Sequence, residues 1–230
     1  MPDYALELVV AHYQENLNWL RRVPATIRKT VYSKSETLST IPNVSSLPNV
    51  GREAHTYLHH LVDRYDSLAD YTIFCQGKPF DHAYDFHHSL RAFAAGDLPD
   101  APFQWLGHII DTDTPDGRLF REWSKNETDE GLDLAEFYQQ LFGTDGPPDY
   151  PFYLGAQFVV TRELVQSQPL GFYQKALELS LNYPNAAHCY ERMWDKVFGV
   201  EGIDRPRLAG RRTVYLKKMR SGSRVAMLRV

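Results

Sequence analysis

Apolar and polar positions follow one another along this chain in a pattern that predicts alternating strands and helices. Short apolar runs without helical spacing, at 6–10, 29–32 and 69–75, indicate buried strands. Ahead of the last run, apolar residues recur at steps of three and four from Ala54 to Leu68, which is typical of an amphipathic helix. Strand, helix and strand in this order predict a parallel sheet with right-handed crossovers.

Weaker patterns complete this outline. A helix is expected from residue 16 to near Pro24, and a loop rich in Ser, Thr, Asn and Pro over 33–48. Apolar spacing indicates four further helices, over 87–95, 134–142, 170–181 and 186–198. Gly199 stands where it can cap the last of them. Strands are expected over 103–110 and 158–160, and a charged, loop-rich segment over 117–148.

Composition places the chain among ordinary globular proteins. Of 230 residues, 43% are hydrophobic and 23% charged, and no stretch reaches the ~20 apolar residues that cross a membrane. The opening residues, Met1 to Tyr4, lack the pattern of a secretory signal. Cys75 and Cys189 lie in apolar surroundings and make neither a disulfide framework nor a zinc site. These features favour a cytoplasmic protein.

The net charge of −4 conceals an uneven distribution. Residues 205–230 hold nine basic side chains and no acidic one, so the first 204 residues carry the other 16 basic and all 29 acidic side chains. We therefore expect a domain over 1–204 and a basic tail over 205–230. The tail is expected to meet an anion, which can be a phosphate ligand, an acidic polymer, an anionic lipid surface, or the acidic body itself.

The turn before the long helix reads Asn49-Val50-Gly51-Arg52-Glu53. Asn49 is a favoured residue for the helix N-cap, and Gly51 permits positive φ or a close backbone approach. The free N–H groups of a helix start attract anions, and the guanidinium of Arg52 suits phosphate oxygens. The alternative is an ordinary capped helix with a surface arginine.

A second polar cluster, Gln76-Gly77-Lys78-Pro79, follows a predicted central strand, where open α/β sheets bind their ligands. Gln76 and Lys78 can hydrogen-bond a nucleotide or sugar, and Asp81 or His82 can ligate a metal. The alternative is a turn that simply ends the strand.

Two further groups carry chemistry. Asp111 and Asp113 form an Asp-Thr-Asp sequence that can share a divalent cation, although it leads directly into a turn. His188 and Glu191 fall on one face of the last predicted helix, with Arg192 beside them. A carboxylate held in this way can act as a general base, or the face can simply be solvated. The absence of P-loop, dinucleotide-binding and nucleophile-elbow motifs argues against the enzyme classes that carry them.

Several motifs in order resemble an uncharacterised family of GT-A-like glycosyltransferases. The most specific are Asn-Val-Gly-Arg-Glu-Ala-His-Thr-Tyr-Leu at 49–58 and the segment 69–79, which ends in Gln-Gly-Lys-Pro. Weaker blocks occur at 8–19, 31–34, 155–162 and 191–194. The resemblance covers most of the chain and implies a single α/β domain with a mixed, mostly parallel sheet flanked by helices.

The resemblance also implies roles for individual residues. It places Ala11, Tyr13 and Glu15 near the base and ribose of a nucleotide-sugar donor. It places Asn49, Gly51 and Arg52 near the nucleotide or diphosphate, and Gln76 and Gly77 at the strand end that holds the diphosphate. Glu191 becomes the base that deprotonates the acceptor hydroxyl, and Arg192 a substrate contact.

Gln76-Gly77 stands where the resemblance leads us to expect Asp-x-Asp. The reaction is therefore expected either to be independent of metal or to use Mn²⁺ or Mg²⁺ held by Asp111, Asp113 or His188. Without a metal, Arg52, Lys78 or the basic tail would neutralise the leaving diphosphate.

The expected function is transfer of a sugar from a nucleotide diphosphate sugar to the hydroxyl of an unknown acceptor, which can be a glycan, a small molecule or a polymer. Two other functions stay open. One is a metal-dependent hydrolase that uses Asp81, His82, His87, His88 or the Asp111/Asp113 pair. The other is a non-catalytic module that binds phosphorylated sugars or an acidic polymer through its tail.

Overall fold

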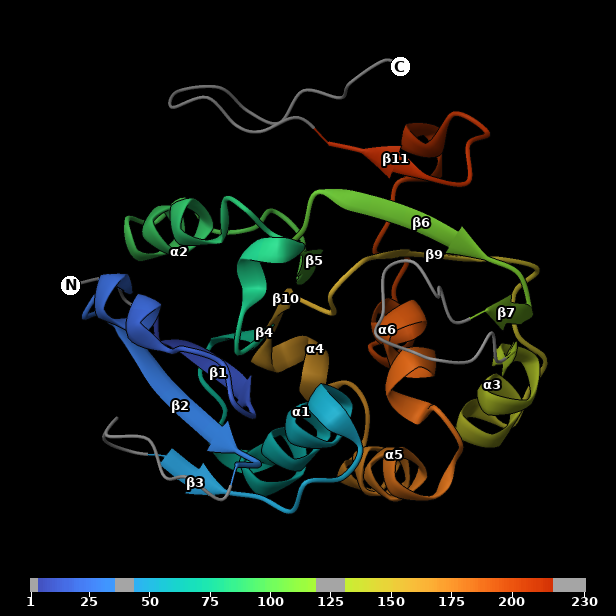
Figure 1. Cartoon of the computed structure of the whole chain (residues 1–230), viewed down its shortest axis with the longest axis horizontal. Helices are drawn as coiled ribbons and strands as arrows, with labels where there is room; N and C mark the ends of the chain where they lie inside the picture. The colour runs from blue at the N-terminus through green and yellow to red at the C-terminus, as the bar shows by residue number, and fades with distance from the viewer. Residues whose placement is uncertain (1–3, 36–43, 119–130, 217–230) are drawn as a thin grey trace.

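A mixed six-stranded sheet forms the centre of the computed structural model, which describes residues 4–35, 44–118 and 131–216 (Figure 1). From one edge to the other the strands are β3 (Val44–Ser46), β2 (Ile27–Ser33), β1 (Leu6–His12), β4 (Tyr71–Gln76), β10 (Phe158–Thr161) and β5 (Phe103–Trp105). The pairs β3–β2, β2–β1 and β1–β4 are parallel, whereas β10 runs antiparallel to both β4 and β5. The predicted α/β fold with a mostly parallel sheet is confirmed.

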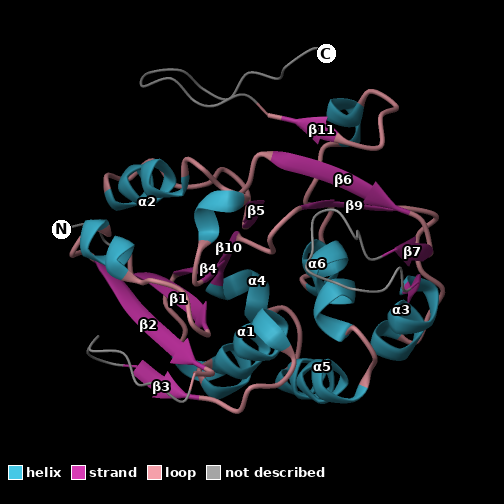
Figure 2. Ribbon diagram, in the orientation of Figure 1, coloured by secondary structure: helices cyan, strands magenta, loops and turns pink. Residues whose placement is uncertain are grey.

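Both faces of this sheet are buried, which explains why its strands read as apolar runs. Val9, Phe74 and Phe158 face one side, and their cluster includes residues of α1 (Arg52–Asp63), α5 (Leu170–Asn182) and α6 (Ala186–Val197). Leu8 and Ile73 face the other side, toward α2 (Phe86–Ala94) and the 3-10 helix η1 (Asn18–Arg22). Helices therefore cover the sheet on both sides (Figure 2).

Smaller elements complete the structure at the carboxyl-terminal half. A three-stranded antiparallel sheet has the order β11 (Val214–Tyr215), β6 (Ile109–Asp113) and β9 (Tyr150–Tyr153). A hairpin-like pair is formed by β7 (Asp116–Arg118) and β8 (Gly131–Asp133). The short helices are α3 (Leu134–Phe142), α4 (Arg162–Gln166) and the 3-10 turns η2 (Tyr65–Ser67), η3 (Pro79–Asp81) and η4 (Arg205–Leu208).

Four expectations about elements were wrong, the first being the loop over 33–48, which contains strand β3. The single strand expected over 103–110 is divided between β5 in the central sheet and β6 in the small sheet. Gly107 lies at this crossing, where an added Cβ would be 2.9 Å from the ring of Tyr153. The helix expected from residue 16 is the short 3-10 helix η1, and the long helix ends at Asp63 rather than continuing to Leu68.

Candidate functional site

A cavity of about 560 Å³ opens at the carboxyl ends of the parallel strands β1, β2 and β4. Between β1 and β4 the strand order changes direction, and open α/β sheets bind ligands at such a point. The volume lies within the range of small-molecule sites. The cavity is lined by Ala11, His12, Tyr13, Glu15, Lys34, Asn49, Arg52, Glu53, Thr56, Gln76, Lys78, Asp81 and His82.

The loop after β1 is fixed by its own polar side chains. His12 places Nδ1 2.9 Å from Ser33 Oγ and Nε2 3.1 Å from the carbonyl oxygen of Glu15. The backbone N–H of Tyr13 donates to Glu15 Oε2 at 2.8 Å, while the Tyr13 side chain is exposed. Tyr13 therefore offers an exposed ring, and Glu15 a carboxylate, to the lining of the cavity.

The loop after β4 packs directly against Glu15. A Cβ on Gly77 would lie 2.5 Å from Glu15 Oε2, so a larger residue there would displace the carboxylate. The carbonyl oxygen of Gly77 accepts a hydrogen bond from Trp19 Nε1 at 2.8 Å. Lys78 forms an exposed ion pair with Asp81 at 2.9 Å, and both residues line the cavity.

The turn before α1 differs from the capped helix start that the sequence predicts. Asn49 is exposed and lines the cavity, but the N-cap residue is Gly51, and no side chain of the described residues caps the helix. Gly51 and Arg52 both have left-handed backbone angles, with φ of +59° and +48°. The expectation of an Asn49 cap was therefore wrong, because the chain enters the helix through two consecutive left-handed residues.

Lys34, which sequence reasoning gave no role, holds this turn in place. It follows β2, and its Nζ donates to the carbonyl oxygens of Val50 and Arg52. The side chain is 7% exposed, and burial lowers its pKa to about 8, so the ammonium remains mostly charged at neutral pH. The sequence did contain one signal for Lys34, because the residue comes just after a predicted strand, where α/β sheets bind ligands.

Arg52 joins the cavity to helix α6. Its Nη1 lies 2.8 Å from His188 Nε2. Burial lowers the pKa of His188 to about 4, so the imidazole is neutral at pH 7 and accepts this hydrogen bond from the guanidinium. His188 Nε2, a nitrogen that could bind a metal ion, therefore faces the guanidinium of Arg52.

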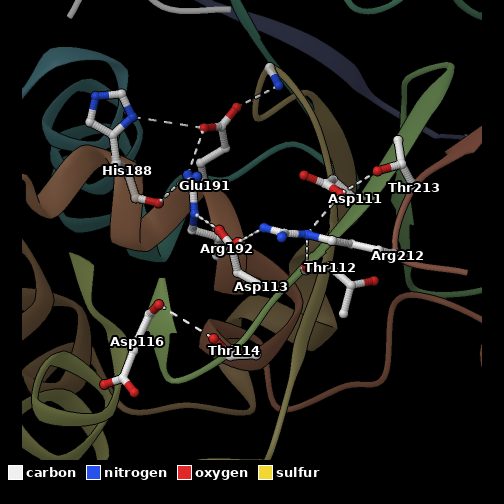
Figure 3. A network of polar contacts seen from close by, with 11 residues as sticks. Asp111, Thr112, Asp113, Thr114, Asp116, His188, Glu191, Arg192, Arg212 and Thr213 are labelled. Atoms are coloured by element: carbon white, nitrogen blue, oxygen red, sulfur yellow. Dashed lines mark hydrogen bonds and ion pairs between the residues drawn. The ribbon is translucent and has the colours of Figure 1, made fainter. Parts of the chain in front are cut away.

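Glu191 and Arg192 form the next part of this network (Figure 3). Glu191 Oε1 accepts from the backbone N–H of Gly155 at 2.6 Å, and Oε2 accepts from Arg192 Nη1 at 3.2 Å. Arg192 is 2% exposed, and its Nε donates to Asp113 Oδ2 at 2.8 Å. Its guanidinium also lies over the ring of Phe152, 4.7 Å from the centroid. Neither Glu191 nor Arg192 is among the residues that line the cavity.

Asp111 and Asp113, the predicted metal ligands, are engaged by cationic and hydroxyl groups. Asp113 Oδ1 accepts from Arg212 Nη2 at 2.9 Å, in addition to its contact with Arg192. Asp111 Oδ1 accepts from the hydroxyl of Thr213 at 2.8 Å (Figure 3). Within the described ranges, no group of three His, Cys, Asp or Glu residues is arranged to hold a metal ion. A metal role for Asp111, Asp113 or His188 stays a prediction.

The histidines of the hydrolase alternative are dispersed. His82 lines the cavity and lies against Gly155, whose added Cβ would be 2.6 Å from the His82 Cβ. His87 instead stacks on the ring of Phe80 at 5.0 Å, and His88 is exposed. Asp81 is paired with Lys78.

Besides Lys34, the sequence assigned no role of their own to two cavity residues, Glu53 in the Asn49–Glu53 turn and Thr56. Glu53 lies in the first turn of α1, and burial raises the pKa of its carboxyl group; Arg52 opposes this shift and Glu191 adds to it. Thr56 is one turn further along α1, and its buried hydroxyl has no hydrogen-bond partner within the described part of the chain. It is therefore available to a ligand.

The first half of the basic segment packs on the domain. Leu208 and Val214 are buried in the larger core cluster, and Arg205 forms an ion pair with Asp149 at 2.7 Å. Arg212 contacts the Asp111/Asp113 pair, as described above. Residues 217–230, which hold the other five of the nine predicted tail cations, lie outside the described residues. Contact of the tail with an anionic surface stays a prediction.

The chain belongs to a family described as a protein of unknown function (DUF3431), whose model matches residues 8–210. This match supports the uncharacterised family named by the resemblance and extends it into the basic segment. No curated protein matches the chain. In the described residues, no helix is both long and apolar enough to span a membrane.

Proposed function

We propose that this member of the DUF3431 family is a glycosyltransferase of the GT-A type that takes its sugar from a nucleotide diphosphate sugar. The observation that carries the proposal is the convergence of three cations, from three different elements, on one cavity. Lys34 comes from the end of β2, Arg52 from the start of α1, and Lys78 from the end of β4. A diphosphate needs cationic donors of this kind.

The rest of the cavity suits the other parts of a sugar nucleotide. Tyr13 offers an exposed ring to a base, and Glu15 an oxygen to ribose hydroxyls. Asn49, Gln76 and Thr56 supply neutral polar groups for sugar hydroxyls. Ala11 lines the cavity with a small side chain, whereas Gly51 and Gly77 are not among the residues that line it and instead pack against Ser180 and Glu15.

The proposed reaction is a displacement at the anomeric carbon. The acceptor oxygen bonds to that carbon, and the carbon–oxygen bond to the diphosphate breaks with its electron pair. The acceptor proton passes to a carboxylate, a role that the sequence resemblance gives to Glu191. Lys34, Arg52 and Lys78 stabilise the charge that develops on the leaving diphosphate. The alternative is a Mn²⁺ or Mg²⁺ ion, which Asp111, Asp113 or His188 would hold and which would neutralise the charge of the diphosphate.

A thermal-shift screen tests this proposal. The protein is heated with uridine, guanosine, cytidine and thymidine diphosphate sugars, each with and without Mn²⁺. A ligand at 100 times its Kd stabilises the native state by about 2.7 kcal/mol. For a domain of this size that corresponds to an increase in Tm of roughly 5–10 °C.

The screen also separates the alternatives. Stabilisation by one base class, followed by release of the free nucleoside diphosphate, supports the glycosyltransferase. Stabilisation without release indicates a non-catalytic sugar-nucleotide module. If no member of the panel raises Tm under either condition, the proposal is wrong.

A further inference from the structure

Two carboxylates near the cavity, Glu53 and Glu191, differ in whether they line it and in the hydrogen bonds they accept. Glu53 is partly exposed and lines the cavity directly, one residue after the diphosphate candidate Arg52. Glu191 belongs to α6 and is not among the residues that line the cavity. The negative charge of Glu191 contributes to the raised pKa of the Glu53 carboxyl group.

The oxygens of Glu191 are already committed. Oε1 accepts from the N–H of Gly155 at 2.6 Å, and Oε2 accepts from the cationic Arg192 at 3.2 Å. Because both oxygens already accept hydrogen bonds from protein groups, fewer lone pairs of Glu191 remain for a substrate hydroxyl. Gly155, whose N–H donates to Glu191, has a left-handed backbone with φ of +94°.

The surroundings of Glu53 favour proton uptake. Burial is the main cause of its raised pKa, and the like charge of Glu191 adds to it. Arg52 and Lys34 act in the opposite direction, and the buried phenol of Tyr57 also experiences both carboxylates. A carboxyl group poised in this way, in a cavity, fits the role of a general base.

We infer that Glu53, rather than Glu191, accepts the proton of the attacking hydroxyl, and that Glu191 is a positioning residue. This inference rests on the proposed glycosyltransferase function. As the new carbon–oxygen bond forms, the proton moves to a Glu53 oxygen and the electron pair of the broken bond leaves with the diphosphate. Glu191 keeps Gly155 and Arg192 in place and, through its negative charge, raises the basicity of Glu53.

The test compares Glu53→Gln with Glu191→Gln, because each substitution keeps the shape of the side chain. Donor affinity is measured by calorimetry with the panel member that binds wild-type protein best. Turnover is measured as release of the free nucleoside diphosphate, with water as the acceptor. The third readout is the dependence of kcat on pH between pH 4 and 9.

Glu53→Gln is expected to lower kcat about 10²–10⁴-fold, the contribution of a general base, while Kd changes less than threefold. Glu191→Gln is expected to retain the acidic limb of the kcat profile but to move it to lower pH, because it removes the like charge beside Glu53. It should also lower Tm, since Arg192 loses an ionic partner.

Each other outcome is decisive. Near-normal turnover in Glu53→Gln overturns the inference and leaves the glycosyltransferase intact. Loss of the acidic limb in Glu191→Gln, with the limb unchanged in Glu53→Gln, assigns the base to Glu191. If wild-type protein binds or turns over no sugar nucleotide, the proposed function fails, and the role of Glu53 fails with it.

Discussion

Replacing Asp113 with Ala tests whether this carboxylate is a structural partner of Arg192 or a metal ligand. The Arg192 and Asp113 side chains are 3% and 1% exposed, and Nε and Oδ2 are 2.8 Å apart. Arg212, the other partner of Asp113, is 60% exposed and can be hydrated instead. The substitution therefore leaves one buried cation without its main ionic partner.

The size of the effect follows from this burial. Removing one member of a buried pair costs about 3–5 kcal/mol, because the other charge stays desolvated. Arg192 keeps its contacts with Glu191 and with the carbonyl oxygen of His188, and it keeps the Phe152 ring. We therefore expect the lower end of the range, a loss of about 3 kcal/mol in the free energy of unfolding.

Urea unfolding followed by far-UV circular dichroism measures this loss. With slopes of about 1–3 kcal/mol per M, the midpoint should fall by about 1 M or more. The matched control is Asp204→Asn, whose ion pair with Arg207 is 3.6 Å long and 59% exposed on both sides. Exposed pairs contribute about 0–1 kcal/mol, so the control should unfold almost as wild type does.

Two results would refute the structural role of Asp113. One is a change of less than about 1 kcal/mol in the Ala variant, below the cost of breaking a buried pair. The other is stabilisation of wild-type protein by Mn²⁺ alone that disappears in the variant, because it would show that Asp113 binds the ion.

Two further predictions concern the turn and the histidines. Gly51→Ala should cost at least about 2 kcal/mol, since a left-handed alanine is strained by about 1 kcal/mol and its Cβ would lie 2.9 Å from the carbonyl oxygen of Ser180. Gly143→Ala, where φ is also positive but no atom lies within 4 Å, should cost only the backbone strain; equal losses in urea unfolding would contradict the close approach. Burial lowers the pKa values of His55, His60 and His188 to about 4, so the unfolded chain binds more protons than the native state below pH 6.5. The contribution of these three histidines to the free energy of unfolding should be present in full above pH 6.5 and fall on acidification toward pH 4, by on the order of 2 kcal/mol per histidine by pH 5. NMR spectra of the native protein in which the imidazoles of His55, His60 and His188 titrate near pH 6.5 would contradict this.

The frame of the fold could be predicted because its strands and helices carry strong local patterns. The apolar runs of β1 and β4 are continuous because both sheet faces are covered, and the spacing in α1 follows its buried face. The division of 103–110 between two sheets could not be predicted, because the apolar residues from Phe103 to Ile110 are interrupted only by Gln104, Gly107 and His108 and contain no strong turn signal. What separates them is the packing of Gly107 against Tyr153, a contact between segments far apart in the sequence.

For the cavity, the sequence could indicate residues at strand ends but not the ion pairs between distant segments. Residues at the end of a strand, such as Gln76, and residues just after one, such as Tyr13, do line one cavity, because parallel strands end at one sheet edge. The ion pairs of Asp113 with Arg192 and Arg212 depend on partners 79 and 99 residues away, so an Asp-Thr-Asp motif alone could not reveal them. For the same reason the sequence did not distinguish the committed carboxylate of Glu191 from that of Glu53.

The central claim is that Arg52 binds the diphosphate of a sugar nucleotide, and calorimetry on Arg52→Ala tests it most directly. The titrants are the panel sugar that stabilises wild-type protein most and the matching nucleoside monophosphate. Arg91→Ala on α2 removes the same charge from an exposed position away from the cavity and serves as the control. A hydrogen bond to a charged group is worth about 1.5–3 kcal/mol, which is roughly 10- to 150-fold in Kd. We predict a loss of that size for the diphosphate sugar in Arg52→Ala, a much smaller loss for the monophosphate, and no change in the control; equal affinity of wild type and Arg52→Ala for the diphosphate sugar would contradict the claim.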